Sequence, residues 1–220
     1  MNKKKYIFKF LDELSRNNSK KWMDENRSTY QLAKTYWLSE VEKMLERLCK
    51  YDSHFEMFTP KNTIQRITNN RMFHPEKPIY KTKFAFSPTR KKDEYAPIFF
   101  SIGAAESLVG GGIWRPNTDI LKKVRAHIDT DENKLQKAIS SKEFVTFFGG
   151  LREDDQKLKT APRGYDYEHP HIELLRYKNF TAGIEPTRET IINKDLADIA
   201  EEVYLKLKPM NDFFHEALHK

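Results

Sequence analysis

Apolar residues recur at helical spacing near both ends of the chain, whereas the middle carries short runs typical of β-strands. Residues 7–14 predict a first helix, with Asn17-Asn18 as its stop and Ser19 as the cap of the next helix. A stripe over residues 22–48 keeps one apolar face for up to about 30 residues, roughly 45 Å of helix. The stripe predicts one long helix with a kink near Tyr36.

The central runs are rich in β-branched and aromatic residues. They predict strands at 63–67, 82–86, 97–102 and 107–114, with a turn at 103–105 and a further edge strand at 180–184. Between them, Asn117 or Thr118 caps a predicted helix, Gly149-Gly150 ends another, and a short helix or turn lies at 172–175. Residues 193–219 predict two C-terminal helices separated at Pro209.

This order of elements predicts an α+β fold, in which N-terminal and C-terminal amphipathic helices flank a small central antiparallel sheet. The 220 residues contain no Pro/Gly/Ser linker, so we expect a single domain over residues 1–220. Cys49 has no second cysteine with which to form an intramolecular disulfide. With no secretory signal and no apolar run that could span a bilayer, we expect a cytoplasmic protein without a membrane partner.

Positive charge is concentrated in one part of the chain. The segment from Thr59 to Lys92 holds nine basic side chains and one acidic side chain, Glu76, whereas the whole chain carries a net charge of +7. The remainder is therefore close to neutral. Basic groups packed together repel one another unless an anion is near, so this segment indicates a surface that meets a negatively charged partner.

The first candidate site is the segment 66–81. Guanidinium groups suit bidentate capture of phosphate or carboxylate, and lysines add point charges. We therefore assign ligand binding to Arg66, Lys77 and Lys81, and proton transfer to Tyr80. The alternative is a solvated basic face that keeps the protein soluble.

The second candidate is the glycine-rich run at 110–116, where Gly111 and Trp114 are assigned to ligand binding. Glycines let a backbone approach a neighbour closely, and the Trp114-Arg115 pair could stack on a flat anion. The run lacks the Gly-Lys-Ser/Thr ending of a phosphate loop. A bulge or a close crossing of strands is therefore the stronger interpretation of its glycines.

The third candidate is the loop 159–171, which brings together cations, carboxylates and imidazoles. We assign anion binding to Lys159 and Arg163, and general acid/base work to Asp166 and His169. The alternative is that the loop is ordinary turn material. Metal binding by His169 and its neighbours is not predicted, because Pro170 interrupts the alternation and no second cluster is evident. No particular cofactor is indicated.

Several of these segments resemble those of a bacterial and fungal family known only as domain of unknown function number 2461. The resemblance covers about residues 8–180. The residues that carry it are Trp22, Tyr30, Lys77, Tyr80, Lys81, the run Gly110-Gly111-Gly112-x-Trp114-x-Pro116, Leu121, Arg125, and the run Leu158-Lys159-x-Ala161-Pro162-Arg163-Gly164-Tyr165-Asp166 with His169-Pro170. The resemblance implies a single cytoplasmic domain and brings no established activity, substrate or cofactor.

The chain departs from the family pattern at three positions. Members usually carry an Arg-Asp pair and then a further Arg before the Phe, whereas this chain has Asn69, Asn70 and Met72 there. Arg71 is adjacent, but in an extended segment a shift of one residue points the side chain to the opposite face. The departure indicates altered ligand choice or an inactive paralogue.

We therefore expect the three segments to share one electropositive hollow that binds an anionic, phosphate-bearing small molecule, with catalysis left open. A nucleic-acid-binding module would use the same cations, with Phe73, Tyr80 and Trp114 as stacking faces. A protein-interaction module would instead expose an apolar patch. Oligomeric state is not predicted.

Overall fold

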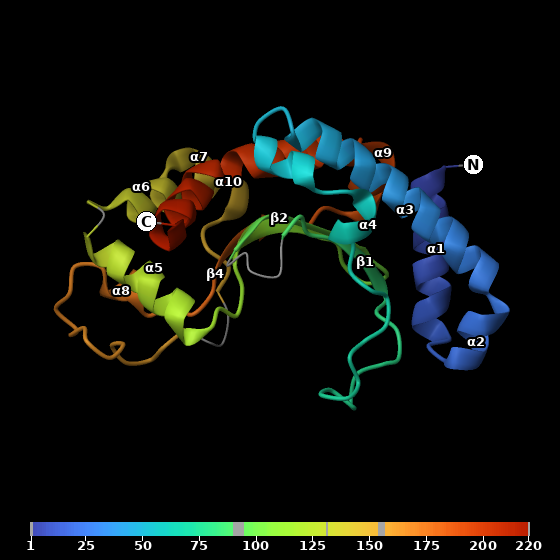
Figure 1. Ribbon diagram of the computed structural model, residues 1–220, viewed down its shortest axis with the longest axis horizontal. Coiled ribbons are helices and arrows are strands. Elements are labelled where there is room, and N and C mark those ends of the chain that lie inside the picture. Colours follow the sequence, from blue (N-terminus) through green and yellow to red (C-terminus); the bar gives the residue numbers. More distant parts are fainter. Residues whose placement is uncertain (1, 90–94, 131, 154–156, 220) are drawn as a thin grey trace. The chain divides into compact units, whose positions relative to one another are not determined.

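The computed structural model describes residues 2–89, 95–130, 132–153 and 157–219 (Figure 1). Three of the nine predicted cations of the basic segment, Arg90, Lys91 and Lys92, lie outside the described residues. The helices are α1 (Lys3–Arg16), α2 (Lys20–Glu25), α3 (Arg27–Leu48), η1 (Ser53–Met57), α4 (Pro60–Thr63), α5 (Thr118–Thr130), α6 (Lys134–Ser140), α7 (Lys142–Phe148), α8 (Ile172–Leu175), α9 (Arg188–Asn193) and α10 (Leu196–His219). The strands are β1 (Lys83–Phe86), β2 (Ala96–Gly103), β3 (Leu108–Ile113) and β4 (Phe180–Ile184).

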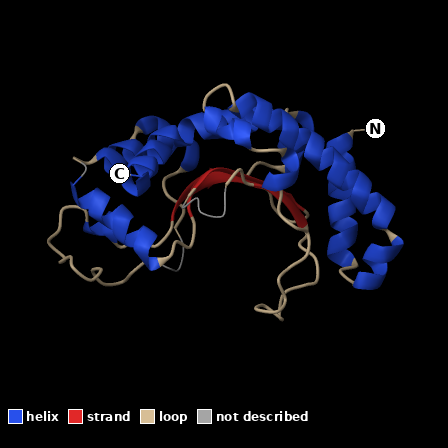
Figure 2. Cartoon of the chain, viewed as in Figure 1, coloured by secondary structure: helices blue, strands red, loops and turns tan. Residues whose placement is uncertain are grey.

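The strands form one sheet in the order β1-β2-β3-β4. Figure 2 colours the strands red and the helices blue. Strand β1 pairs antiparallel with β2, and the register places Phe84 opposite Ile102 and Phe86 opposite Phe100. With helices before and after this small sheet in the sequence, the predicted α+β fold is confirmed. Among the described residues, none of the helices combines the length and the apolarity needed to cross a bilayer.

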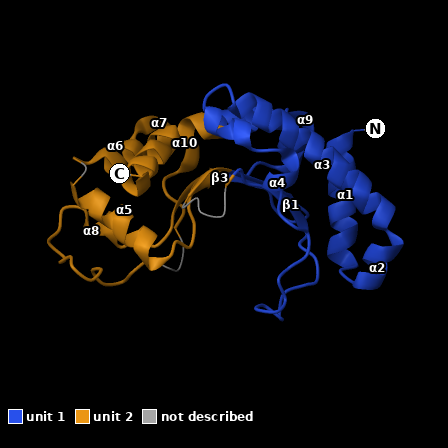
Figure 3. Ribbon diagram, in the orientation of Figure 1, with its two compact units in different colours: residues 1–88, 99–109, 185–202 blue, residues 89–98, 110–184, 203–220 orange. Residues whose placement is uncertain are grey.

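The chain divides into two compact units (Figure 3). Unit 1 consists of residues 1–88, 99–109 and 185–202, and unit 2 of residues 89–98, 110–184 and 203–220. The chain passes between them several times, so neither unit is a continuous stretch of sequence. The single-domain prediction did not include this division.

Unit 1 is built on the apolar faces of α1 and α3. Phe10 of α1 and Trp37 of α3 are fully buried, and both rings stack on Phe84 of β1, at centroid distances of 6.0 and 6.3 Å. Such large apolar rings each remove a large area from water on folding. The sequence stripe therefore predicted the core of this unit correctly.

Unit 2 contains β4, parts of β2 and β3, the helices α5, α6, α7 and α8, and the later part of α10. The buried residues Val124 and Ile128 of α5 confirm the predicted apolar face, and Asn117 caps this helix by accepting a hydrogen bond from the Ile120 N–H at 2.9 Å. Phe180 of β4 and Phe214 of α10 are fully buried and meet edge to face at 6.0 Å.

Two predicted elements in unit 1 were wrong. The long helix is broken at Asn26, which leaves helical geometry (φ −108°, ψ 22°) and ends α2, so the interruption lies ten residues before the expected kink at Tyr36. Residues 63–67 do not form a strand: Pro60 begins the short helix α4, and only Ile64 makes an isolated bridge, to Phe86. Proline is favoured in the first turn of a helix, and this local preference outweighed the β-branched residues.

Pro209 does not end the C-terminal helix, contrary to the prediction. Helix α10 continues through it to His219. The proline ring is exposed, while Met210, Phe213 and Phe214 on the following turns are buried. Apolar packing of those turns offsets the backbone hydrogen bond that proline removes.

The glycines of β3 permit close approach to β4. A Cβ atom at Gly112 would lie 2.1 Å from the Phe180 carbonyl oxygen, and Gly112 has a φ of +113°. Only glycine satisfies both conditions. This observation supports the close strand crossing as the reason for these glycines.

We expect Gly112→Ala to destabilise the protein by about 2 kcal/mol or more, because both the contact and the backbone conformation are violated. The matched control is Gly149→Ala, where φ is +76° but nothing lies within 4 Å of the added Cβ, so only backbone strain is introduced. Urea unfolding of both variants measures the difference. Equal losses in the two variants would contradict a close crossing at Gly112.

Candidate anion-binding site

The predicted site residues fall in both units. Arg66, Lys77, Tyr80 and Lys81 belong to unit 1, and the remaining six belong to unit 2, namely Gly111, Trp114, Lys159, Arg163, Asp166 and His169. A hollow shared by all three segments stays a prediction. Each unit can be assessed by itself, and unit 2 holds a well-defined arrangement.

A hollow of about 560 Å³ lies in unit 2 between helix α5 and the loop that follows α7. It is lined by Lys122, Arg125, Asp129, Arg163, Gly164 and Tyr165. Three cations face one carboxylate, so the lining carries an excess of positive charge. Of the predicted site residues, only Arg163 is among those that line it.

Arg125, which lines the hollow, joins helix α5 to the end of helix α8. Its Nε donates to the Leu175 carbonyl at 2.8 Å and an Nη donates to the Tyr177 carbonyl at 3.3 Å. These carbonyls lie at and just beyond the last turn of α8, where a cation is favoured. No carboxylate lies within ion-pair distance of Arg125 among the described residues, and burial lowers the pKa of its guanidinium. The result is a half-buried cation that forms no ion pair with the described part of the chain.

Arg163 is placed by a tight turn. The Tyr165 N–H donates to the Pro162 carbonyl at 3.1 Å, and Gly164 takes φ +95° at the third position of this turn. Gly164 at the third position supplies the positive φ that such a turn requires, and Pro162 at the first position provides the accepting carbonyl. Arg163 is exposed and has no ion pair within the described part of the chain.

His169 fastens the same loop to helix α5. Its Nδ1 accepts from the His171 N–H at 3.0 Å, and its Nε2 lies 2.8 Å from Asp129 Oδ1. Because Nδ1 accepts, the neutral ring carries its proton on Nε2 and donates it to Asp129. Both ring nitrogens are therefore engaged within the fold. Proton transfer by His169 would require one of these bonds to open.

Tyr165 is the neutral donor of the hollow. Burial raises the pKa of its hydroxyl, and the Asp129 carboxylate adds to the shift, while Arg125 opposes it. The phenol consequently keeps its proton at neutral pH and can donate a hydrogen bond to an anion. Its ring also meets His169 edge to face at 5.5 Å.

The other predicted residues of unit 2 have local partners or are solvated. Asp166 accepts from the Glu168 N–H at 2.9 Å and so stabilises a turn, and Lys159 is exposed. Trp114 is 58% exposed, with the Arg115 guanidinium 5.3 Å from its ring centroid. Gly111 is buried: a Cβ there would lie 2.9 Å from the Leu207 side chain. Packing accounts for this glycine.

In unit 1 the predicted residues lie along a chain segment that pairs with itself. Tyr80 is buried, and the Asn18 side chain binds its N–H and its carbonyl at 2.9 and 2.8 Å. Lys81 donates from Nζ to the Arg66 carbonyl at 2.8 Å. Burial lowers the pKa of Lys81, and the nearby Lys83 and Lys77 lower it further.

A second hollow in unit 1, of about 230 Å³, makes a useful contrast. Its Arg188 makes two hydrogen bonds of 2.7 Å to the Asp12 carboxylate and one of 2.8 Å to the Ala104 carbonyl. The hydrogen bond to Asp12 raises the pKa of Arg188. This arginine already has its anion, whereas Arg125 and Arg163 have no ion pair to any carboxylate that the structure describes.

Sequence reasoning did not assign site roles to Lys122, Arg125, Asp129 and Tyr165. A usable signal was present: residues 122, 125 and 129 follow the spacing of one helical face, directly before an Arg-Gly-Tyr turn. What the sequence could not show is that this face of α5 meets that turn.

The comparison with protein families agrees with the motifs quoted above. The model of the conserved hypothetical protein family DUF2461 matches residues 6–213. The chain belongs to this family. The description of DUF2461 names no activity. No curated protein and no solved structure matches the chain. The family match includes the whole of the α5 face and the Arg163 turn.

The described residues of this DUF2461 member offer no cluster of metal-ligating side chains. Within residues 2–89, 95–130, 132–153 and 157–219, no three His, Cys, Asp or Glu side chains come together as ligands. The lining of the hollow holds three cations and the Tyr165 hydroxyl against one carboxylate, Asp129, and this excess of positive charge suits an anion.

The Asp129–His169 bond predicts a measurable local effect. In His169→Ala the loop loses a bond worth about 1 kcal/mol, since the pair is partly exposed, and amides of residues 163–171 should exchange roughly fivefold faster. Hydrogen exchange with mass spectrometry on the full chain measures this. Asp119→Asn, at an exposed carboxylate on the first turn of α5, is the control. Unchanged exchange in His169→Ala would show that the ring does not fasten the loop.

Proposed function

We propose that this protein binds a small phosphate-bearing anion in the hollow of unit 2. Arg163 and Arg125 supply guanidinium donors, Lys122 adds a point charge, and Tyr165 donates a hydrogen bond. Guanidinium groups match the paired oxygens of phosphate, and a lysine completes the charge balance.

One observation carries this proposal: the partly desolvated Arg125 has backbone carbonyls as partners and, among the residues that the structure describes, no carboxylate within ion-pair distance. Burying a charge without a counter-charge costs free energy, and burial lowers the pKa of this guanidinium accordingly. An anion in the hollow would recover that free energy, because Coulomb attraction is strong where water is partly excluded. Arg188 in unit 1 has no such need, since Asp12 already meets it.

The volume supports an organic ligand rather than a bare ion. Small-molecule sites commonly enclose about 300 to 1,000 Å³, and this hollow of about 560 Å³ lies within that range. The ligand would place its phosphate between the cations and extend over the exposed part of the loop.

Binding, rather than catalysis, is the activity that these side chains support best. Among the described residues that line the hollow, Asp129 is the sole carboxylate, and its Oδ1 accepts from His169. Asp166 is engaged in a turn, and Tyr80 belongs to unit 1. A reaction at this site would need the Asp129–His169 bond to open so that either group could take a proton.

The proposal is tested by isothermal titration of the full chain with inorganic phosphate and pyrophosphate. We expect binding with a preference for pyrophosphate, whose two phosphate groups can meet all three cations. Arg163→Gln should weaken it about tenfold or more, because a charge-assisted hydrogen bond contributes about 1.5 to 3 kcal/mol.

Neighbouring lysines on α5 provide a matched control pair. Lys122 lines the hollow and Lys123 does not, although both are exposed. Lys122→Gln should weaken binding severalfold, and Lys123→Gln should leave it unchanged. Absence of binding at millimolar anion, or equal effects of the two lysine variants, would refute the site.

A further inference from the structure

Residues 66–81 of unit 1 form a hydrogen-bonded arm next to β1. The Lys81 N–H donates to the Ile67 carbonyl at 2.6 Å, the Asn69 N–H to the Ile79 carbonyl at 3.0 Å, and Thr68 bridges Tyr80 antiparallel. The Asn69 side chain donates to the Pro78 carbonyl at 2.8 Å. The two sides of the arm are therefore held together up to its tip, and Asn18 fastens its base at Tyr80.

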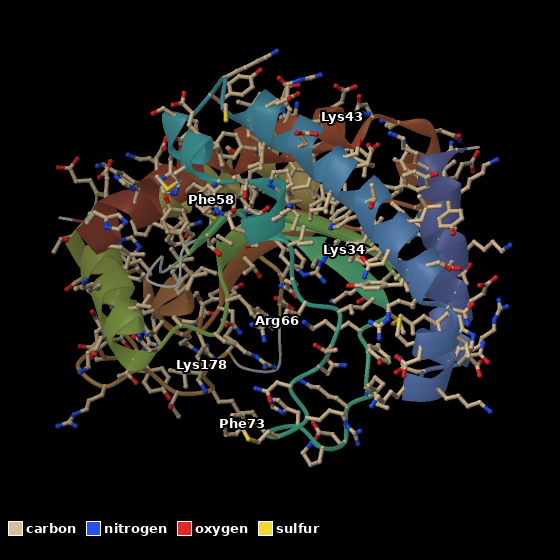
Figure 4. All side chains as sticks on the ribbon, turned by 45° about the vertical axis from the view of Figure 1, so that its right-hand side comes forward. Lys34, Lys43, Phe58, Arg66, Phe73 and Lys178 are labelled. Carbon is tan, nitrogen blue, oxygen red and sulfur yellow. The ribbon has the colours of Figure 1, made fainter. Side chains whose placement is uncertain are left out.

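The tip presents two adjacent apolar side chains to solvent. Met72 is 80% exposed and Phe73 is 70% exposed, the two highest values among the large hydrophobic residues that the structure describes. Phe73 lies at the far end of the arm, away from Arg66 at its base (Figure 4). Burying such side chains is favourable, and their placement at a tip indicates a partner there.

Cations accompany the arm from tip to base. They are Arg71, Lys77, Lys81 and Arg66 on the arm and Lys83 on β1, against a single carboxylate, Glu76, which lies 3.5 Å from His74. No ion pair to a carboxylate involves these five within the described residues. Burial lowers the pKa of Lys81, and repulsion by the charges of Lys83 and Lys77 lowers it further. A polyanion would relieve this repulsion.

We propose that this arm is a binding element for duplex DNA, with Phe73 and Met72 as a wedge between base pairs and the flanking cations on the phosphates. Apolar wedges of this kind, combined with arginine and lysine, are the means by which proteins unstack and bend a duplex through its minor groove. Cations placed behind the wedge would contact the backbone on both sides of the opened step.

The structure favours a duplex over other polyanionic partners. Single-stranded binding relies on successive aromatic faces, and Tyr80, the second predicted stacking residue of this segment, is only 8% exposed. An anionic membrane would accept the same cations, but the neighbours of the wedge are Asn70, Arg71 and His74, all polar. The arm belongs to unit 1 and the proposed phosphate site to unit 2, so the two proposals stand independently.

The test uses the full chain and a fluorescent 20-base-pair duplex that contains 2-aminopurine, with affinity measured by anisotropy at two salt concentrations. We expect salt-dependent binding and a rise in 2-aminopurine fluorescence as a step unstacks. Phe73→Ala should abolish the rise and weaken binding about tenfold. Lys77→Gln and Lys83→Gln should each reduce the salt slope by about 0.9.

Controls come from exposed positions elsewhere in unit 1. Leu32→Ala on α3 and Lys21→Gln on α2 should change neither the fluorescence nor the slope. No binding at low salt, binding without unstacking, or tighter binding to the matching single strand would overturn the proposal. So would weakening by Phe73→Ala of binding to phosphatidylserine vesicles but not to the duplex.

Discussion

The contact between Arg125 and the end of helix α8 is the interaction on which the proposed site of unit 2 depends. Through hydrogen bonds to the Leu175 and Tyr177 carbonyls, this side chain joins α5 to α8, and it brings a positive charge into a partly dry environment. The loop with Arg163 and Tyr165 is fastened to α5 through the hydrogen bond between Asp129 and His169. Structural bonds thus position the cations, and the positive excess in the hollow follows from that framework.

Local patterns predicted much of the fold. The apolar periodicity of α1, α3 and α5 and the β-branched runs of β1, β2 and β3 are signals contained within a few residues, so they survive in the structure. The failures came where two local signals competed. At Pro209 the burial of the following turns keeps α10 continuous through the proline. At Asn26 the helix breaks, although the apolar stripe continues through this residue.

The site was harder to predict because it is made by contacts between distant residues. Arg125 and Leu175 are 50 residues apart, and Asp129 and His169 are 40 apart. Arg163, Lys77 and Lys81 could be predicted as candidate residues, because a concentration of positive charge and the prolines and glycines of a turn are visible in the local sequence. No local sequence pattern shows which carboxylate His169 contacts, or that both of its ring nitrogens form hydrogen bonds within the fold. From the sequence, His169 was therefore interpreted as a catalytic base, whereas in the structure it fastens a loop.

The two units carry two different kinds of positive surface. In unit 2 the cations line a hollow and are ordered by backbone carbonyls and a phenol, an arrangement suited to a compact anion. In unit 1 the cations follow the arm with its apolar tip, an arrangement suited to an extended anion. Asn69 and Met72, where family members usually carry arginine, belong to the arm and not to the hollow, so the departure from the family pattern leaves the hollow intact.

The anion site beside Arg125 can be tested with a crystal structure of the full chain grown with tungstate, a tetrahedral dianion whose metal atom is located by anomalous scattering. We expect a peak within hydrogen-bonding distance of the guanidinium groups of Arg125 and Arg163. Tungstate bound only at other surfaces, and none beside Arg125, would refute the proposed anion site.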